Sequence, residues 1–151
     1  MSAITLLIED PDWRVHRGLQ ARLKQAAEVA RRAAKLKGGF SILLADDRTL
    51  RGLNRDFRGI DKTTNVLSFP AASAPGGHAG DIAIAYGVTR REAKAAGKRF
   101  ADHALHLAVH GVLHLAGHDH IRPKDAKVME ALEVKILARF GIADPYAIMP
   151  Q

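Results

Sequence analysis

Three histidines in the C-terminal half of the chain have the spacing of a metal site. Residues 110–120 read HGVLHLAGHDH, which sets His110, His114 and His120 in the pattern H-x-x-x-H-x-x-G-x-x-H. Residues four apart project from one face of an α-helix, so the first two imidazoles can share an ion. Gly117 favours the end of the helix and a reversal of the chain direction, which would bring His120 to the same ion. The chain has no cysteine, and three imidazoles with an open position are typical of catalytic rather than structural zinc.

The same spacing occurs in the metzincin peptidases, with one difference. Gly111 stands where those enzymes carry the glutamate that serves as general base. Glycine transfers no proton, so a metallopeptidase-like hydrolase is the weaker interpretation. A glycine within a helix costs about 1 kcal/mol relative to alanine, which indicates a close approach at this point. Either the substrate nears the metal there, or the helix packs tightly on a sheet.

The neighbouring side chains leave the ligand set and several roles open. His103 and His106 lie on roughly the same helical stripe, so periodicity alone equally allows a His106/His110 pair. As non-ligands, these two would pack in the core or orient a ligand. His118 either lines the site or is exposed. Asp119 either orients a ligand and takes a proton, or only caps a turn.

Composition predicts one basic domain. With 151 residues, 47% of them hydrophobic, the chain suffices for one core, so residues 1–151 are expected to form a single domain. The net charge of +7 favours an anionic partner, nucleic acid first. Residues 13–37 predict a basic helix that is either a solvated face or a phosphate-binding surface. This segment contains one acid, Glu28, and eight basic residues. The basic residues are Arg14, Arg17, Arg22, Lys24, Arg31, Arg32, Lys35 and Lys37.

The sequence gives no sign of membrane insertion. No segment approaches the roughly 18 apolar residues of a membrane span, and the first residues do not resemble a signal peptide. A cytoplasmic protein is therefore expected.

The elements that position these residues follow from hydrophobic periodicity and turn signals. Strands are predicted at residues 3–9, 40–45, 65–69 and 81–86, and helices at about 12–37, 46–57, 100–116 and 124–140, with one more from 89 to Gly97. This order predicts an α+β fold, with a small mixed sheet of about four strands packed with about five helices. The zinc site would lie on a long helix and the turn after it.

Three sequence blocks carry a resemblance to a known family. They are LNRDFRGIDKTTNVLSFP at 53–70, GDI at 80–82 and the histidine block. In this order and spacing they resemble the YbeY family of bacterial endoribonucleases, and the likeness spans nearly the whole chain. It implies a small mixed sheet surrounded by helices, one zinc on His110, His114 and His120, and a catalytically important arginine at Arg58. The chain departs from the common family form at His118, where tyrosine is frequent, and at His103, where an acidic residue is expected.

The resemblance also implies a function and partners. It predicts a metal-dependent, single-strand-specific endoribonuclease of 16S ribosomal RNA 3′ end maturation and ribosome quality control. The expected partners are ribosomal RNA, the 30S subunit or a small-subunit ribosomal protein, and a ribosome-assembly GTPase. A non-catalytic ribosome-assembly factor with structural zinc remains the alternative. Imidazole sites also accept nickel and copper, so zinc is the first expectation among three metals.

The chemistry expected of such a site needs three parts. The ion supplies a Lewis acid, and Arg58 binds the phosphate as charge develops. The general base is Asp119, a phosphate oxygen of the substrate, or no protein group. Lys62 either assists or is simply solvated. Turn hydrogen bonds that position the loop are the expected role of Asn54, Asp61 and Asn65.

Overall fold

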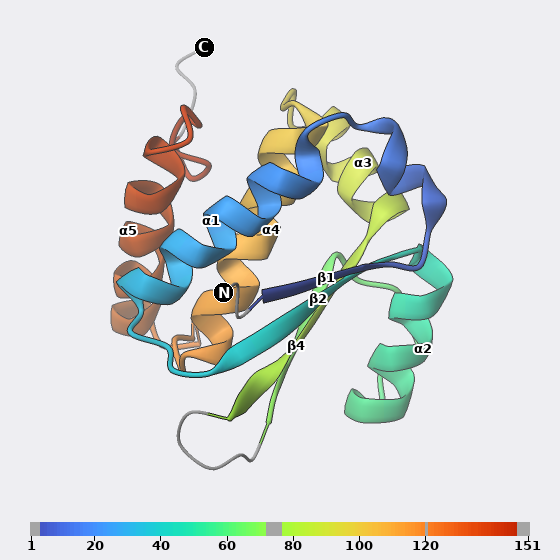
Figure 1. Cartoon of the computed structure of the whole chain (residues 1–151), viewed down its shortest axis with the longest axis horizontal. Helices are drawn as coiled ribbons and strands as arrows, with labels where there is room; N and C mark the ends of the chain where they lie inside the picture. Colours follow the sequence, from blue (N-terminus) through green and yellow to red (C-terminus); the bar gives the residue numbers. More distant parts are fainter. Residues whose placement is uncertain (1–3, 72–76, 120, 148–151) are drawn as a thin grey trace.

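The computed structural model describes residues 4–71, 77–119 and 121–147. Its elements follow the predicted order, with one short 3-10 helix added (Figure 1). They are β1 (Ile4–Ile8), η1 (Pro11–Val15), α1 (Leu19–Ala33), β2 (Gly39–Ala45), α2 (Asp47–Arg58), β3 (Val66–Pro70), β4 (His78–Ala85), α3 (Tyr86–Ala95), α4 (Phe100–Leu115) and α5 (Pro123–Ala138). The α+β prediction of one domain with four strands and five α-helices is confirmed for this part of the chain. None of these helices combines the length and apolar character that crossing a bilayer requires.

The sheet is mixed, as predicted, with the strand order β1-β2-β4-β3. β1 and β4 both run parallel to β2, whereas β3 pairs antiparallel with β4. The register sets Ile42 of β2 between Leu6 of β1 and Ile82 of β4. β3 is thus an edge strand, and the chain that leads into it lies at the border of the sheet.

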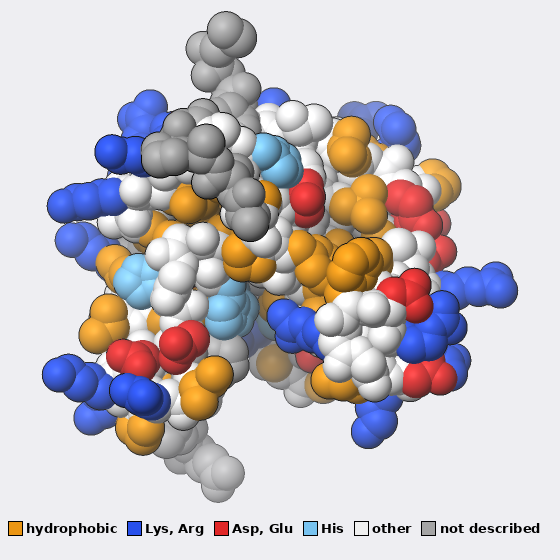
Figure 2. Space-filling model, turned by 90° about the horizontal axis from the view of Figure 1, so that it is seen from below, with side chains coloured by type: hydrophobic (Ala, Val, Ile, Leu, Met, Phe, Trp, Pro, Cys, Tyr) orange, Lys and Arg blue, Asp and Glu red, His pale blue; other side chains and the backbone are white. Residues whose placement is uncertain are grey.

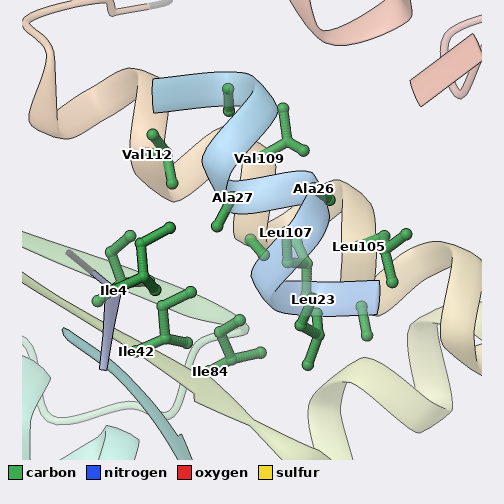
Figure 3. Close-up of a cluster of buried hydrophobic side chains, with 14 of the residues drawn as sticks. Ile4, Leu23, Ala26, Ala27, Ile42, Ile84, Leu105, Leu107, Val109 and Val112 are labelled. Atoms are coloured by element: carbon green, nitrogen blue, oxygen red, sulfur yellow. The ribbon is translucent and has the colours of Figure 1, made fainter. Parts of the chain in front are cut away.

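Helices cover the two faces of the sheet unequally. α1 and α4 cross one face, and α5 and α3 pack beside them, whereas α2 lies on the other face (Figure 1). The main core fills the space between α1, α4 and the sheet, and it includes Leu23 of α1, Ile42 of β2 and Ile84 of β4 (Figure 3). A smaller core under α2 centres on Leu50. α4 is therefore the central helix, and its apolar side is fixed by both α1 and the sheet.

The predicted basic helix is shorter than expected. Gly18 adopts a left-handed φ of 75°, which separates η1 from α1, so the continuous helix over residues 12–37 is wrong at both ends. Within α1, Glu28 accepts hydrogen bonds from both Arg31 and Arg32. These ion pairs compensate two of the four cations that α1 retains, which favours the solvated-face interpretation.

The segment before α1 is held by Trp13. Its side chain is fully buried, and its indole N–H donates to the carbonyl of Ala45 at 3.0 Å. The ring packs edge-on against Tyr86 and tilted against Phe100, with 5.4 Å between ring centroids in each case. Trp13 thus ties η1 to the end of β2 and to the starts of α3 and α4.

Candidate metal centre and cleft

The histidine helix α4 ends as predicted. Gly117 has a φ of 96°, and its N–H donates to the carbonyl of His114 while the N–H of His118 donates to that of Leu113. This bond pair is the Schellman arrangement, which requires a left-handed residue and therefore favours glycine. The chain therefore turns at Gly117, just beyond the last turn of α4, on which His114 lies. His120, the third predicted ligand, lies outside the described residues.

His110 and His114 meet on one face of α4. Their Nε2 atoms are 3.1 Å apart, and their ring centroids 4.6 Å. Zn–N bonds are about 2.0 to 2.1 Å long, so two nitrogens at this separation can ligate one ion from the same side. The His106 ring is farther from His110, with 6.3 Å between centroids. Its Nε2 hydrogen-bonds to Glu133 instead.

Glu133 of α5 organises the back of this histidine stripe. Its carboxylate is buried and accepts hydrogen bonds from His106, from Nδ1 of His110 at 3.2 Å and from the hydroxyl of Tyr146 at 2.7 Å. A carboxylate that holds one imidazole nitrogen fixes the tautomer of the ring and frees the other nitrogen for a metal. Glu133 therefore presents Nε2 of His110 towards His114.

The same carboxylate can also take part in metal binding. Potential ligand atoms of His106, His110 and Glu133 all lie within 4.8 Å of one another, so this group can hold an ion directly. Without an ion, the carboxylate of Glu133 accepts hydrogen bonds from both imidazoles. Imidazole and carboxylate together form a donor set that divalent transition metals accept. The residues present thus fit a metal ion around His110.

The environment of Glu133 keeps it ionised. Burial raises the pKa of its carboxyl group, but the hydrogen bonds from His106, His110 and Tyr146 outweigh burial and lower the pKa to about 2. Burial and the bond to Glu133 raise the pKa of Tyr146 well above its ordinary value. Tyr146 therefore remains a donor, and Glu133 remains an acceptor, across the neutral pH range.

A cleft of about 650 Å³ brings the predicted residues together. Arg58, His110, His114 and Asp119 all line it. Figure 2 shows a hollow on this face of the molecule, with histidine side chains on one side and basic side chains on the other. Asp119 also accepts a hydrogen bond from the N–H of Ile121 at 3.1 Å, so it does cap a turn. Both roles considered for Asp119 are compatible with its position.

The end of α2 places Arg58 at the cleft, and polar contacts hold the loop that follows it. Arg58 is the last residue of α2, and Gly59 ends the helix with a φ of 71°. The buried amide of Asn54 donates to the carbonyl of Lys62 at 2.9 Å, and Asp61 accepts two hydrogen bonds from Arg51. The predicted loop-positioning role of these polar residues is thus supported.

Two further loop residues have distinct positions. Asn65 accepts a hydrogen bond from the N–H of Val66 and donates to Glu92. Asn65 also lines the cleft. Lys62 lines a different cavity, beside Arg51 and Asp61.

Gly111 faces the sheet. A Cβ there would lie 2.9 Å from Cγ2 of Ile82 and 3.2 Å from Oγ of Ser68, and Ser68 donates to the carbonyl of Gly111 at 3.0 Å. The close approach is therefore packing against β3 and β4. A glutamate at this position would point into the core rather than into the cleft, which argues against peptidase chemistry.

Replacing Gly111 with alanine should destabilise the protein by about 1 kcal/mol. The gain in helix propensity is about 1 kcal/mol, and overpacking costs about 1–3 kcal/mol because Ile82 is buried on a strand. Urea unfolding measures the difference. Gly52→Ala is the matched control, because Gly52 lies within α2 with no atom within 4 Å of an added Cβ. Equal stabilisation by both changes would contradict this packing argument.

Glu133 is the site residue that sequence reasoning missed. It shares the buried face of α5 with Met129, Ile136 and Leu137. A glutamate at a core position of an amphipathic helix is a signal in itself, because an unpaired buried carboxylate is costly. Its partners could not be named from the sequence, since His110 and Tyr146 lie on other segments.

Comparison with known proteins identifies the family. The family model described as "Endoribonuclease YbeY" matches residues 8–141. A protein named endoribonuclease YbeY from Maricaulis maris is 43% identical over 148 residues, covering 97% of this chain and 92% of its own length. Another of that name, from Chelativorans sp., is 51% identical over 144 residues, covering 90% of this chain and 88% of its own length. The chain belongs to the YbeY endoribonuclease family. The resemblance stated from the three sequence blocks is therefore confirmed.

A solved structure supports the fold of this YbeY family member. The solution structure of TM1509 from Thermotoga maritima superposes with a TM-score of 0.61 and covers 96% of this chain and 99% of its own. Its sequence is 22% identical, so the likeness concerns the fold alone. The mixed sheet with α4 across it is thus an arrangement that a distant sequence also adopts.

Proposed function

We propose that this protein is a zinc-dependent endoribonuclease that cleaves single-stranded RNA in the cleft between Arg58 and the His110/His114 pair. Membership of the YbeY endoribonuclease family supports the reaction class. The observation that carries the proposal is one cleft lined by a cationic guanidinium and by two imidazoles at ligand spacing. Residues 1–151 act as a single catalytic domain.

Arg58 binds the scissile phosphate. Its guanidinium is exposed at the end of α2 and lines the cleft, and its planar fork matches the oxygens of a phosphodiester. Its fixed positive charge stabilises the extra negative charge that develops on the phosphorus oxygens during cleavage. Asn54 and the Arg51–Asp61 ion pair hold the loop that follows Arg58.

His110, His114 and His120 would hold the ion. When bound, zinc supplies a Lewis acid for the phosphate and lowers the pKa of water. Glu133 holds the His110 ring through Nδ1, and Asp119 lines the same cleft as a proton acceptor. Nickel or copper are the other metals that this imidazole set would accept.

The biological role that we propose is the one that the family resemblance implies. We place the protein in the maturation of the 16S ribosomal RNA 3′ end and in ribosome quality control, in the cytoplasm. Its partners would be the 30S subunit or a small-subunit ribosomal protein, and a ribosome-assembly GTPase. The net charge of +7 supports a polyanionic substrate.

The test combines metal analysis with cleavage of a single-stranded ribosomal RNA fragment. We expect about one metal ion per chain in the wild type and cleavage that a chelator abolishes. Arg58→Ala should reduce cleavage about a hundredfold, because it removes a preorganised charge from the transition state. Arg55→Ala is the matched control: Arg55 lies one turn earlier on α2, is exposed and pairs with Asp56.

Contaminating nuclease must be excluded, since traces give false activity. Equal cleavage by wild type, Arg58→Ala and chelator-treated protein would refute the proposed site. A metal-loaded wild type that cleaves no single-stranded RNA would favour the non-catalytic assembly factor instead.

A further inference from the structure

A second cavity, of about 510 Å³, lies next to the cleft. It runs along the histidine stripe of α4 and the end of α3, and Asn65, Val66 and His110 line both it and the cleft. The two cavities therefore adjoin along the segment that enters β3. A polynucleotide whose phosphate contacts Arg58 has the second cavity within reach of an adjacent nucleotide. We name it the side cavity.

Glu92 provides the side cavity with a fixed acceptor. Its Oε1 accepts hydrogen bonds from the amide of Asn65 at 3.0 Å and from Nε2 of His103 at 2.9 Å. Burial lowers the pKa of His103, although the hydrogen bond to Glu92 opposes this, so the imidazole donates as a neutral ring. Among the described residues no donor bonds Oε2 of Glu92, and the side chain is 43% exposed. The carboxylate is thus oriented by two neighbours and open to a ligand.

The remaining lining suits a flat aromatic ring. Val66 and Leu107 contribute apolar surface, and Ala95 and Ala96 leave space at the end of α3. A carboxylate repels phosphate, so the backbone of an RNA chain would avoid this cavity. Neutral bases of single-stranded RNA are commonly read by hydrogen bonds along their Watson–Crick edges.

We propose that the side cavity binds a nucleobase next to the scissile phosphate, and that Glu92 selects guanine there. Guanine fits because its N1–H and N2–H donors lie side by side and can both donate to Oε2, while Oε1 stays bonded to Asn65 and His103. Adenine presents only one donor on that edge, next to an acceptor that the carboxylate repels. This inference rests on the proposed function and adds a base preference to it.

Uridine decamers that contain one internal guanosine, adenosine or cytidine test the proposal. The wild type should cut the guanosine oligonucleotide at one fixed distance from the guanosine, with a kcat/KM at least about fivefold above the adenosine oligonucleotide. In Glu92→Gln the ratio of kcat/KM for the guanosine oligonucleotide to that for the adenosine oligonucleotide should fall close to one, because an amide offers one acceptor and one donor. Ala95→Phe fills the side cavity from an exposed position and should also remove the preference.

Asp12→Asn is the control, since it removes the same charge at an exposed site on η1. It should keep the guanosine ratio of the wild type. Efficient cleavage by the wild type with a ratio near one, or a ratio unchanged in both Glu92→Gln and Ala95→Phe, would overturn the side-cavity proposal alone. Failure of the metal-loaded wild type to cleave any of the decamers would overturn the nuclease function on which it rests.

Discussion

His114→Ala should lose its metal ion and at least about a thousandfold of its RNA cleavage while it remains folded. Nε2 of His114 lies 3.1 Å from that of His110, so the change removes one of the nitrogens that would hold the ion. Loss of an outer partner of a metal ligand already costs about 10-fold to 100-fold, and loss of a ligand itself should cost more. His114 lies in the last turn of α4 and is only partly buried, so alanine leaves the helix and the main core intact.

Metal content and cleavage rate are measured on the same preparation, with circular dichroism as the check on folding. His78→Ala is the matched control, because His78 is an exposed histidine that pairs with Asp81 at the start of β4. The control should keep both metal and activity. If His114→Ala binds metal as tightly as the wild type, the assignment of His114 as a ligand fails. If it unfolds, the metal has a structural role and the assembly-factor alternative gains support.

Glu133→Ala should reduce the free energy of unfolding by about 3–5 kcal/mol, even without metal. The carboxylate is buried and pairs with His106, His110 and Tyr146. Removing one partner of such a network leaves buried polar groups unsatisfied, and the methyl group leaves a cavity as well. Urea unfolding in excess chelator measures this loss, and Glu130→Ala on the same helix is the control.

The isosteric change Glu133→Gln separates charge from volume. The pKa of Glu133 is held at about 2 in the folded protein, below that of an unfolded glutamate. Its ionised form therefore contributes stability that is complete above the unfolded pKa and is lost as the pH falls towards about 2. In chelator-treated protein, the free energy of unfolding of Glu133→Gln should therefore fall less steeply than that of the wild type as the pH is lowered. The network contributes little to stability if the pH dependence of unfolding in Glu133→Gln equals that of the wild type. The same conclusion follows if Glu133→Ala is as stable as the wild type.

Local sequence signals predicted the elements well. The helix predicted over residues 46–57 corresponds to α2, and the carboxylate of Asp46 caps its start by accepting from the N–H of Thr49 at 2.8 Å. The helical period predicted that His110 and His114 share a face, and Gly117 predicted the turn after them. All of these depend on residues within about one helical turn of each other. By contrast, the break at Gly18 was missed, because hydrophobic periodicity continues across it.

Long-range contacts explain what the sequence could not predict. Glu133 reaches His110 only because α5 packs beside α4, and Tyr146 joins them from the segment after α5. Likewise, the side on which Gly111 lies depends on how α4 crosses the sheet. Such contacts follow from the packing of whole elements, which spacing within one segment does not encode.

The burial of Trp13 has a practical consequence for spectroscopy. It is the one tryptophan of the chain, and its contacts are with Tyr86, Phe100 and the carbonyl of Ala45, none of which lines the cleft. Its fluorescence emission should shift to longer wavelength when the core opens to water, and should be insensitive to the loss of an ion at His110. The molecule thus carries an intrinsic optical probe that distinguishes an unfolded variant from an intact one with an empty site.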